Sequence, residues 1–169
     1  MIKNRGFTLI ELLVVVAIIG MLSSVVLSSL NTARGAARDA RRGQDIKQIQ
    51  TALELYFNTN GFYPVSGWAH SGNGGNTNWN NLETALAPFI ASLPDDPINT
   101  GSAGYNNDQF AYSYYASGYG GTGRWYMLIW ELENPNPSFE NNDGVTTCDG
   151  TFFHYGNGTN GIVSSGGSC

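Results

Sequence analysis

The chain has 169 residues, of which 41% are hydrophobic and 12% charged, and its formal net charge is −5. Seven of its eight basic residues lie within residues 1–48, whereas residues 49–169 hold ten acids and a single arginine. This acidic balance disfavours direct nucleic-acid binding by residues 49–169, because phosphate backbones are held by basic surfaces. The sequence also has only two histidines and no GxSxG, Cys-x-x-Cys or phosphate-loop pattern, which argues against an enzyme.

The first predicted element is a long helix that starts in a membrane-like stretch. A basic leader with Lys3 and Arg5 precedes residues 7–30, an apolar run of about the length that crosses a bilayer as a helix. The positive-inside bias places the N-terminus in the cytoplasm and the rest of the chain beyond the membrane. Glu11 is the only ionisable residue of this run.

Glu11 has two interpretations, which can coexist in an uncut chain. A carboxylate within an apolar membrane helix costs about 2.5–3.5 kcal/mol at the bilayer centre, so it usually has a partner. Thr8-x-x-Glu11 fits a capping box, and an acid in the first turn suits the helix dipole. Alternatively, a cut before Phe7 creates a charged amine that Glu11 can meet.

The stretch Gly6-Phe7-Thr8-Leu9-Ile10-Glu11-Leu12 resembles the class III signal of type IV pilins and type II secretion pseudopilins. This resemblance implies that a prepilin peptidase cuts between Gly6 and Phe7 and methylates the amine of Phe7. It also implies that Glu11 meets the Phe7 amine of a neighbouring subunit during assembly. At Ser28, where the family commonly has a helix proline, the chain departs from the pattern.

The same resemblance implies the partners and the location of the protein. The partners would be identical or homologous pilin subunits in a helical homopolymer, the prepilin peptidase, an inner-membrane assembly platform and, before assembly, membrane lipid. The chain would first cross the cytoplasmic membrane once and then join an extracellular or periplasmic filament. No cofactor is expected apart from calcium.

Two other classes of protein can carry a similar N-terminus. A general secretory signal would end in a small-residue cleavage site, for which the sequence offers weak candidates, and Glu11 would be unusual inside its core. A single-span anchor could instead present an extracellular glycan-binding domain, with exposed tryptophans such as Trp68 and Trp79 stacking on sugars.

Residues 31–60 are predicted to continue the helix as its amphipathic half. In residues 31–43, four arginines among alanines can touch lipid headgroups or acidic neighbours, or simply form a solvated face. Further along, apolar residues recur at helical spacing on one stripe: Ile46, Ile49, Leu53, Tyr56 and Phe57. Such an apolar stripe must pack against another element, most simply a β-sheet.

Residues 61–169 are predicted to form a globular head of loops, a short helix and strands. We expect a loop over residues 65–80, a helix over 80–87, and an antiparallel hairpin made of residues 110–117 and 124–132. Residues 152–155 are a candidate third strand. Five residues are candidates for the inner face of the sheet: Tyr112, Tyr114, Trp125, Met127 and Ile129. Which face points inward stays open, because nearly every position of the two strands is apolar or aromatic.

The predicted fold class is therefore α+β, in which a long N-terminal helical spine packs on a small antiparallel sheet and its hydrophobic half protrudes. Tyr63-Pro64 and Leu93-Pro94-x-Asp96-Pro97 strengthen the resemblance, since they are similar to the major pseudopilin pattern. For Asp95 and Asp96, turn chemistry is preferred to a metal site, because Asp beside Pro favours turns. His70, in a glycine- and serine-rich stretch, is expected to be solvated.

The C-terminal region carries two further expectations. Cys148 and Cys169 are the only cysteines of an exported domain, which favours a disulfide worth about 3 kcal/mol over two free thiols. Oxygen ligands near Asp143 and Asp149 can serve calcium, and major pseudopilins carry a calcium site in this region. The alternative is that this Asn/Asp/Gly run only forms turns.

Overall fold

The structure is a computed structural model that describes residues 7–101, 110–134, 145–153 and 161–167. The predicted leader, residues 1–6, lies outside the described residues. The chain divides into two compact units, residues 1–37 and 38–169, and each is described here by itself.

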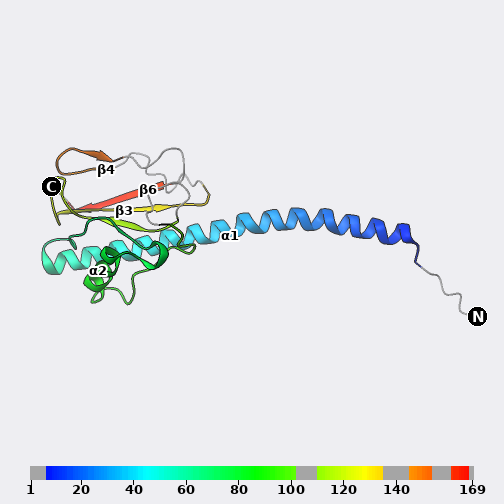
Figure 1. The fold of residues 1–169 in the computed structure, drawn as a ribbon, viewed down its shortest axis with the longest axis horizontal. Coiled ribbons are helices and arrows are strands. Elements are labelled where there is room, and N and C mark those ends of the chain that lie inside the picture. Colours follow the sequence, from blue (N-terminus) through cyan, green and yellow to red (C-terminus); the bar gives the residue numbers. More distant parts are fainter. Residues whose placement is uncertain (1–6, 102–109, 135–144, 154–160, 168–169) are drawn as a thin grey trace, which may run out of the picture. The chain divides into compact units, whose positions relative to one another are not determined.

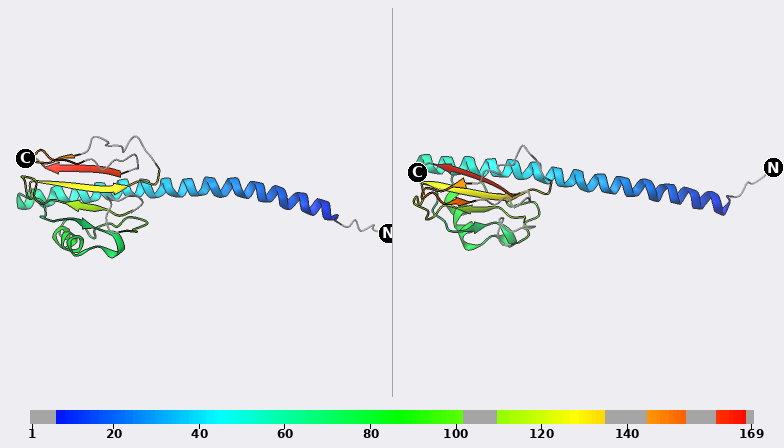
Figure 2. Two further views of the ribbon diagram at one scale, coloured as in Figure 1. Left: turned by 45° about the horizontal axis from the view of Figure 1, so that its top comes forward. Right: turned by 90° about the horizontal axis from the view of Figure 1, so that it is seen from above.

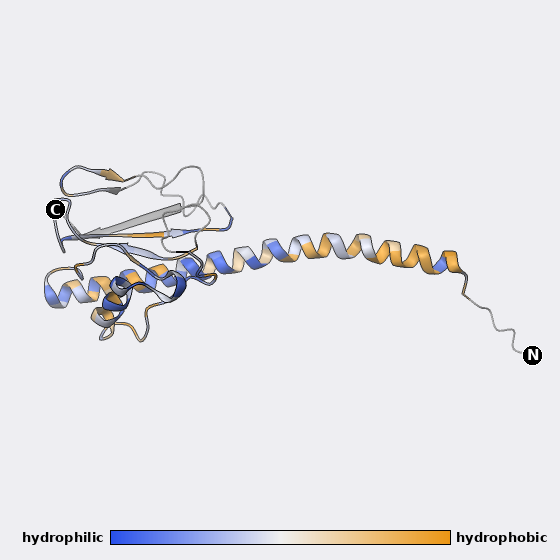
Figure 3. Ribbon diagram, in the orientation of Figure 1, coloured by the Kyte–Doolittle hydropathy of each residue, from blue (hydrophilic) through white to orange (hydrophobic). Residues whose placement is uncertain are grey.

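The first unit contains the beginning of helix α1, Leu9–Asn60, which is a single 52-residue helix. Every side chain from residue 7 to residue 34 is exposed, and most of those up to Leu30 are apolar, as the orange part of α1 in Figure 3 shows. Helix α1 ends where Gly61 adopts a left-handed φ of 78° and donates its N–H to the Phe57 carbonyl at 2.7 Å. The predicted continuous helix is therefore confirmed.

The second unit is built on an antiparallel sheet with the strand order β1-β2-β3-β6. Its strands are β1 (Ala69–His70), β2 (Ser113–Tyr115), β3 (Trp125–Glu131) and β6 (Gly161–Gly167). The predicted hairpin is confirmed, since Tyr114 of β2 pairs with Leu128 of β3. A separate two-stranded sheet consists of β4 (Val145–Thr146) and β5 (Phe152–Phe153).

The part of α1 that belongs to this unit covers one face of the sheet (Figures 1 and 2). The helical stripe is buried as predicted: Ile49 and Leu53 have no exposed surface, and Tyr56 and Phe57 pack at the margin. Opposite them lie inward-facing sheet residues, and α2 (Thr77–Leu86) closes the same core with its own apolar side chains. The main members of this core are Ile46, Ile49, Leu53, Trp79, Leu82, Leu86, Tyr112, Tyr114, Tyr126, Leu128 and Trp130.

The other face of the sheet is also buried, which corrects the predicted inner face. Trp125, Met127 and Ile129 form a second cluster, with Phe153 of β5 and Cys148 packed against it. They point away from Tyr112 and Tyr114 because side chains alternate along a strand. All seven residues of β3 are buried, so its near-continuous apolar run does not reveal which side faces α1.

Three other expectations for the head need correction. Residues 65–80 are not only a loop, since they contain β1, the short 3-10 helix η1 (Gly72–Gly74) and the start of α2. Helix α2 begins at Thr77 because the Asn76 side chain accepts a hydrogen bond from the Trp79 N–H at 2.9 Å. Residues 152–153 pair with β4, whereas the long strand beside β3 is the Gly/Ser-rich β6.

Candidate functional site

The N-terminal end of α1 holds Glu11 in a capping box. One carboxylate oxygen of Glu11 accepts hydrogen bonds from the Thr8 N–H at 2.9 Å and from the Thr8 hydroxyl at 2.7 Å. The Glu11 N–H donates in return to the Thr8 hydroxyl at 3.3 Å. Two backbone donors that the helix leaves open are thereby satisfied within one turn.

Both Glu11 and its neighbours remain accessible in this arrangement. Phe7 is 77% exposed, and no apolar side chain of the chain's described part covers the first turn. Gly6, the other half of the expected processing site, lies outside the described residues. Within the described residues, α1 is the one helix that is long and apolar enough to cross a membrane, judged by length and composition alone.

A second polar site lies inside the head and was not anticipated from the sequence. We call it the Arg42 cluster, and it comprises Arg38, Asp39, Arg42, Asp96 and Glu133. The side chain of Arg42 is fully buried, and that of Asp96 is as well. The prediction that the arginines of residues 31–43 form a solvated face is thus wrong for Arg42.

The guanidinium of Arg42 is bound by three carboxylates from separate parts of the chain. It donates to both oxygens of Asp96, from Nε at 2.7 Å and from Nη2 at 3.1 Å. Its Nη1 donates to Asp39 at 2.6 Å and to Glu133 at 2.9 Å, and its plane lies over the Phe110 ring at 4.7 Å. Four of the five N–H donors are therefore used, as a buried charge requires.

The acids of the Arg42 cluster are themselves tied to backbone. Asp96 accepts the N–H of Ile98 at 2.8 Å, so its expected turn role is present together with the ion pair. Asp39 accepts the N–H of Glu133 at 2.9 Å, just beyond the end of β3. Arg38 pairs with Glu133 through Nε at 2.6 Å and through Nη2.

The electrostatics of the Arg42 cluster follow from this geometry. Burial alone lowers the pKa of Arg42, but the hydrogen bonds and charges of its carboxylates raise it above the usual value. The hydrogen bond from Arg38 lowers the pKa of Glu133, against the opposing effect of its burial, and Arg42 adds to the lowering. Arg42 and Glu133 are consequently both charged throughout the neutral range.

A related buried contact lies one turn further along α1. Asp45 accepts a hydrogen bond from the Tyr112 hydroxyl at 2.9 Å, and burial together with the charge of Asp45 raises the pKa of Tyr112. Asp45 also faces Arg41, whose side chain is 62% exposed, at 3.5 Å. The sequence did contain one signal for these contacts: Arg42 stands four residues before Ile46, on the buried stripe.

The expected cysteine and calcium sites fall partly outside the described residues. Cys148 is half-buried and disulfide-bonded, but Cys169 is not described, so the Cys148–Cys169 pairing stays a prediction. Asp149 accepts hydrogen bonds from the Thr151 N–H at 2.9 Å and the Thr147 hydroxyl at 2.8 Å. Asp143 is not described, and within the described residues no group of three His, Cys, Asp or Glu side chains is arranged to hold a metal ion, so the calcium site also stays a prediction.

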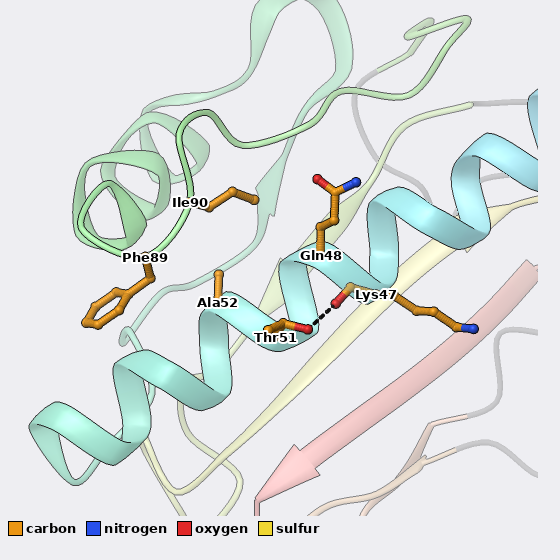
Figure 4. A pocket seen from close by; sticks show the side chains of 6 residues that line it. All are labelled: Lys47, Gln48, Thr51, Ala52, Phe89 and Ile90. Atoms are coloured by element: carbon orange, nitrogen blue, oxygen red, sulfur yellow. Dashed lines mark hydrogen bonds between the residues drawn. The ribbon is translucent and has the colours of Figure 1, made fainter.

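One hollow of the head lies along α1, among residues that the structure describes. A groove of about 300 Å³ lies between α1 and the segment after α2 (Figure 4). Of the six residues that line it, Lys47 alone is ionisable, and Thr51 donates its hydroxyl to the Lys47 carbonyl at 2.8 Å. No described side chain that lines this groove pairs a nucleophile with a base, the arrangement that covalent catalysis uses.

The tryptophans expected to stack on sugars are engaged inside the head. Trp79 is 3% exposed and belongs to the main core. Trp68 is half-buried and packs on Tyr115, with 4.8 Å between ring centroids. His70 is also half-buried rather than solvated, and burial lowers its pKa.

The N-terminal segment around Phe7 and Glu11 matches a known sequence motif. A family model described as the prokaryotic N-terminal methylation motif matches residues 1–27. This match confirms the resemblance that the residues Gly6 to Leu12 carry.

Relatives of known name share this chain's sequence over about 60 residues. Type II secretion system core protein G of Escherichia coli (strain K12) is 39% identical over 64 residues, which cover 38% of this chain and 44% of that protein. The same core protein of Pectobacterium carotovorum subsp. carotovorum is 37% identical over 62 residues, 37% of this chain and 40% of that protein. Type IV major pilin protein PilA of Myxococcus xanthus (strain DK1622) is 36% identical over 55 residues, 32% of this chain and 25% of that protein.

The matched part thus spans less than half the length of these relatives. No solved structure matches the chain.

Removing the cation of the Arg42 cluster should destabilise the head strongly. We expect Arg42→Met to lower the free energy of unfolding by about 3–5 kcal/mol, because it leaves buried carboxylates without a partner. The measurement is denaturant unfolding of the full chain in detergent micelles, followed by tryptophan fluorescence. Arg41→Met is the matched control and should cost less than about 1 kcal/mol, since the Arg41 side chain is 62% exposed and lies 3.5 Å from its acid. Equal losses for the two variants would contradict the role of Arg42.

The lowered pKa of Glu133 predicts a loss of stability in acid. A carboxyl whose pKa is lower in the folded than in the unfolded chain stabilises the fold above its ordinary value, 4.5, and this contribution disappears as the pH falls through the folded value. The free energy of unfolding, measured from about pH 6 to about pH 3, should therefore fall less steeply in Glu133→Gln than in the unaltered chain. Thr84→Ala, an exposed change on α2 that removes no titrating group, should keep the original slope.

Proposed function

We propose that this chain is a structural subunit of the pilin or pseudopilin kind, which is inserted in the cytoplasmic membrane and then assembled into a filament. The observation that carries the proposal is Glu11, the one ionisable residue in an exposed apolar helical run that follows a methylation-type N-terminus. The filament would be a type IV pilus or a type II secretion pseudopilus, in keeping with the printed names of the relatives.

The proposed processing converts the N-terminus into an assembly site. A prepilin peptidase would cut between Gly6 and Phe7 and methylate the new amine of Phe7. That amine adds a positive charge four residues before Glu11, which the uncut chain does not have there. A neighbouring copy that brings its Phe7 amine to Glu11 would neutralise the carboxylate within the apolar packing of the filament.

The proposed topology follows from the distribution of charge and hydropathy. Lys3 and Arg5 would stay on the cytoplasmic side, residues 7–30 would cross the membrane, and the acidic head would lie beyond it. The inner-membrane assembly platform would then extract the helix into the filament. The proposed role is structural rather than catalytic.

The proposed processing predicts the mass of the mature chain. Protein recovered from its native cells should start at Phe7 and carry one extra methyl group, as intact-mass spectrometry would show. A membrane-bound chain that still begins at Met1 would favour the fixed single-span anchor instead. A start near residue 30 would indicate an ordinary secreted domain and would remove the roles given to Phe7 and Glu11.

Substitutions at the capping box separate assembly from helix capping. Glu11→Leu and Glu11→Gln should both abolish filaments while the chain still enters the membrane, because each removes the charge that meets the Phe7 amine. Thr8→Ala should retain filaments, because it weakens the cap and keeps the acid. The measurements are filament yield by electron microscopy and membrane fractionation of the same cells.

The glutamine variant is the decisive one. Glutamine at this position can still take part in a capping box, so only its missing charge distinguishes it from Glu11. Normal filament yield from Glu11→Gln would show that Glu11 is a capping residue and would refute the assembly role.

A further inference from the structure

A small polar pocket in the head has lining chemistry that the filament role does not use. It has a volume of about 190 Å³ and lies between the end of α1, residues 64–66 and the exposed side of α2. All of its lining residues belong to the head unit: Tyr56, Pro64, Val65, Ser66, Asn78, Asn81, Leu82 and Ala85.

The polar side chains of this pocket, which we call the amide pocket, have unused hydrogen-bonding capacity. Asn78 and Asn81 are three residues apart and therefore lie on one face of α2. Asn78 donates its Nδ2 to the Trp68 carbonyl at 3.0 Å, which leaves its oxygen as an acceptor. The Asn81 amide and the Tyr56 hydroxyl form no hydrogen bond with any other residue that the structure describes, so both can bind a ligand.

The walls of the amide pocket are held in place by the surrounding fold. The Tyr56 ring is fixed by edge contacts with Phe62 at 5.9 Å and Phe89 at 6.0 Å between centroids. Helix α2 is anchored by its Asn76 cap and by Leu82, which is 2% exposed. The pocket therefore needs little rearrangement to accept a ligand, which lowers the entropic cost of binding.

The lining defines the class of ligand. None of the residues that line the pocket carries a formal charge at neutral pH, so the pocket has no partner for an anion or a cation. A purely apolar ligand would bury the two amides without hydrogen bonds, which is unfavourable. A small neutral molecule that combines several hydroxyls with apolar C–H faces satisfies both conditions.

A pyranose ring has this combination. Its size suits a pocket of about 190 Å³, which is smaller than the roughly 300–1,000 Å³ of pockets for drug-sized ligands. Its hydroxyls can pair with the donors and acceptors of Asn81, Asn78 and Tyr56, while Val65, Ala85 and the Tyr56 ring offer apolar surface. We propose that the amide pocket binds one neutral pyranose unit, such as the terminal sugar of a polysaccharide. This site differs from the one expected at Trp68 and Trp79, whose rings pack within the head.

Binding can be tested on the unassembled full chain in phosphocholine-headgroup micelles, which contain no sugar. Saturation-transfer NMR would be recorded with the methyl pyranosides of glucose, galactose, mannose and N-acetylglucosamine. We expect saturable binding of at least one of them, with a dissociation constant of about 1 mM. Asn81→Ala should weaken it by about fivefold or more, because the central amide is lost.

Asn80→Ala is the matched control, since Asn80 is the neighbouring exposed asparagine of α2 and does not line the pocket. It should bind as the unaltered chain does, and both variants should keep the same melting temperature. Binding of none of the four sugars, or equal loss in both variants, would overturn the proposal. Because the measurement uses single chains, its failure would leave the filament role untouched, and failure of filament assembly would leave the sugar site untouched.

Discussion

The head depends on a buried cation. Arg42 has no exposed surface, and a guanidinium can be placed there only when carboxylates compensate its lost hydration. The three acids that do so come from α1 itself, from the segment after Leu93 and from the end of β3. Those three parts of the chain therefore meet at one point inside the folded head.

The Arg42 cluster also specifies the register of α1 against the sheet. An apolar stripe alone tolerates a shift by one turn, because Ile46, Ile49 and Leu53 are similar in size and chemistry. Such a shift would carry Arg42, together with Asp39 on the same helix, away from Asp96 and leave the buried Asp96 without a cation, at a cost of several kcal/mol. The apolar stripe provides most of the apolar surface that α1 buries against the sheet. The ion pairs of Arg42 then select one alignment of α1 among those that the stripe permits.

How far the sequence predicted this structure depends on whether the signal was local. The motif Gly6 to Glu11, the helical stripe of α1 and the hairpin around residue 118 rest on neighbouring residues, and each was recognised. The helix predicted from residue 80 begins at Thr77 in the structure, although Asn76 is a local N-cap signal. The partnership of Arg42 with Asp96, 54 residues apart, cannot be derived from spacing, and Asp96 beside its prolines is equally explained as a turn.

Strand β6 was missed for a different physical reason. Its sequence is rich in glycine and serine, which have little intrinsic preference for strands, yet it pairs with all seven residues of β3. Pairing of this kind is driven by the backbone groups that an edge of β3 would otherwise expose, not by the side chains of the added strand. The same limit explains the inner face: with both faces of β3 covered, hydrophobicity no longer identifies the side toward α1.

The internal use of basic residues has a consequence for the proposed assembly. Arg38 and Arg42 are bound to acids of their own head, and residues 49–169 hold only one further basic residue. The remaining exposed acids give the head surfaces of like charge, so identical heads repel each other weakly, at a strength that salt reduces. In the proposed filament, attraction between copies would then come chiefly from burial of the apolar residues 7–30, and the proposed pairing of Glu11 with a Phe7 amine would make one acid compatible with that burial.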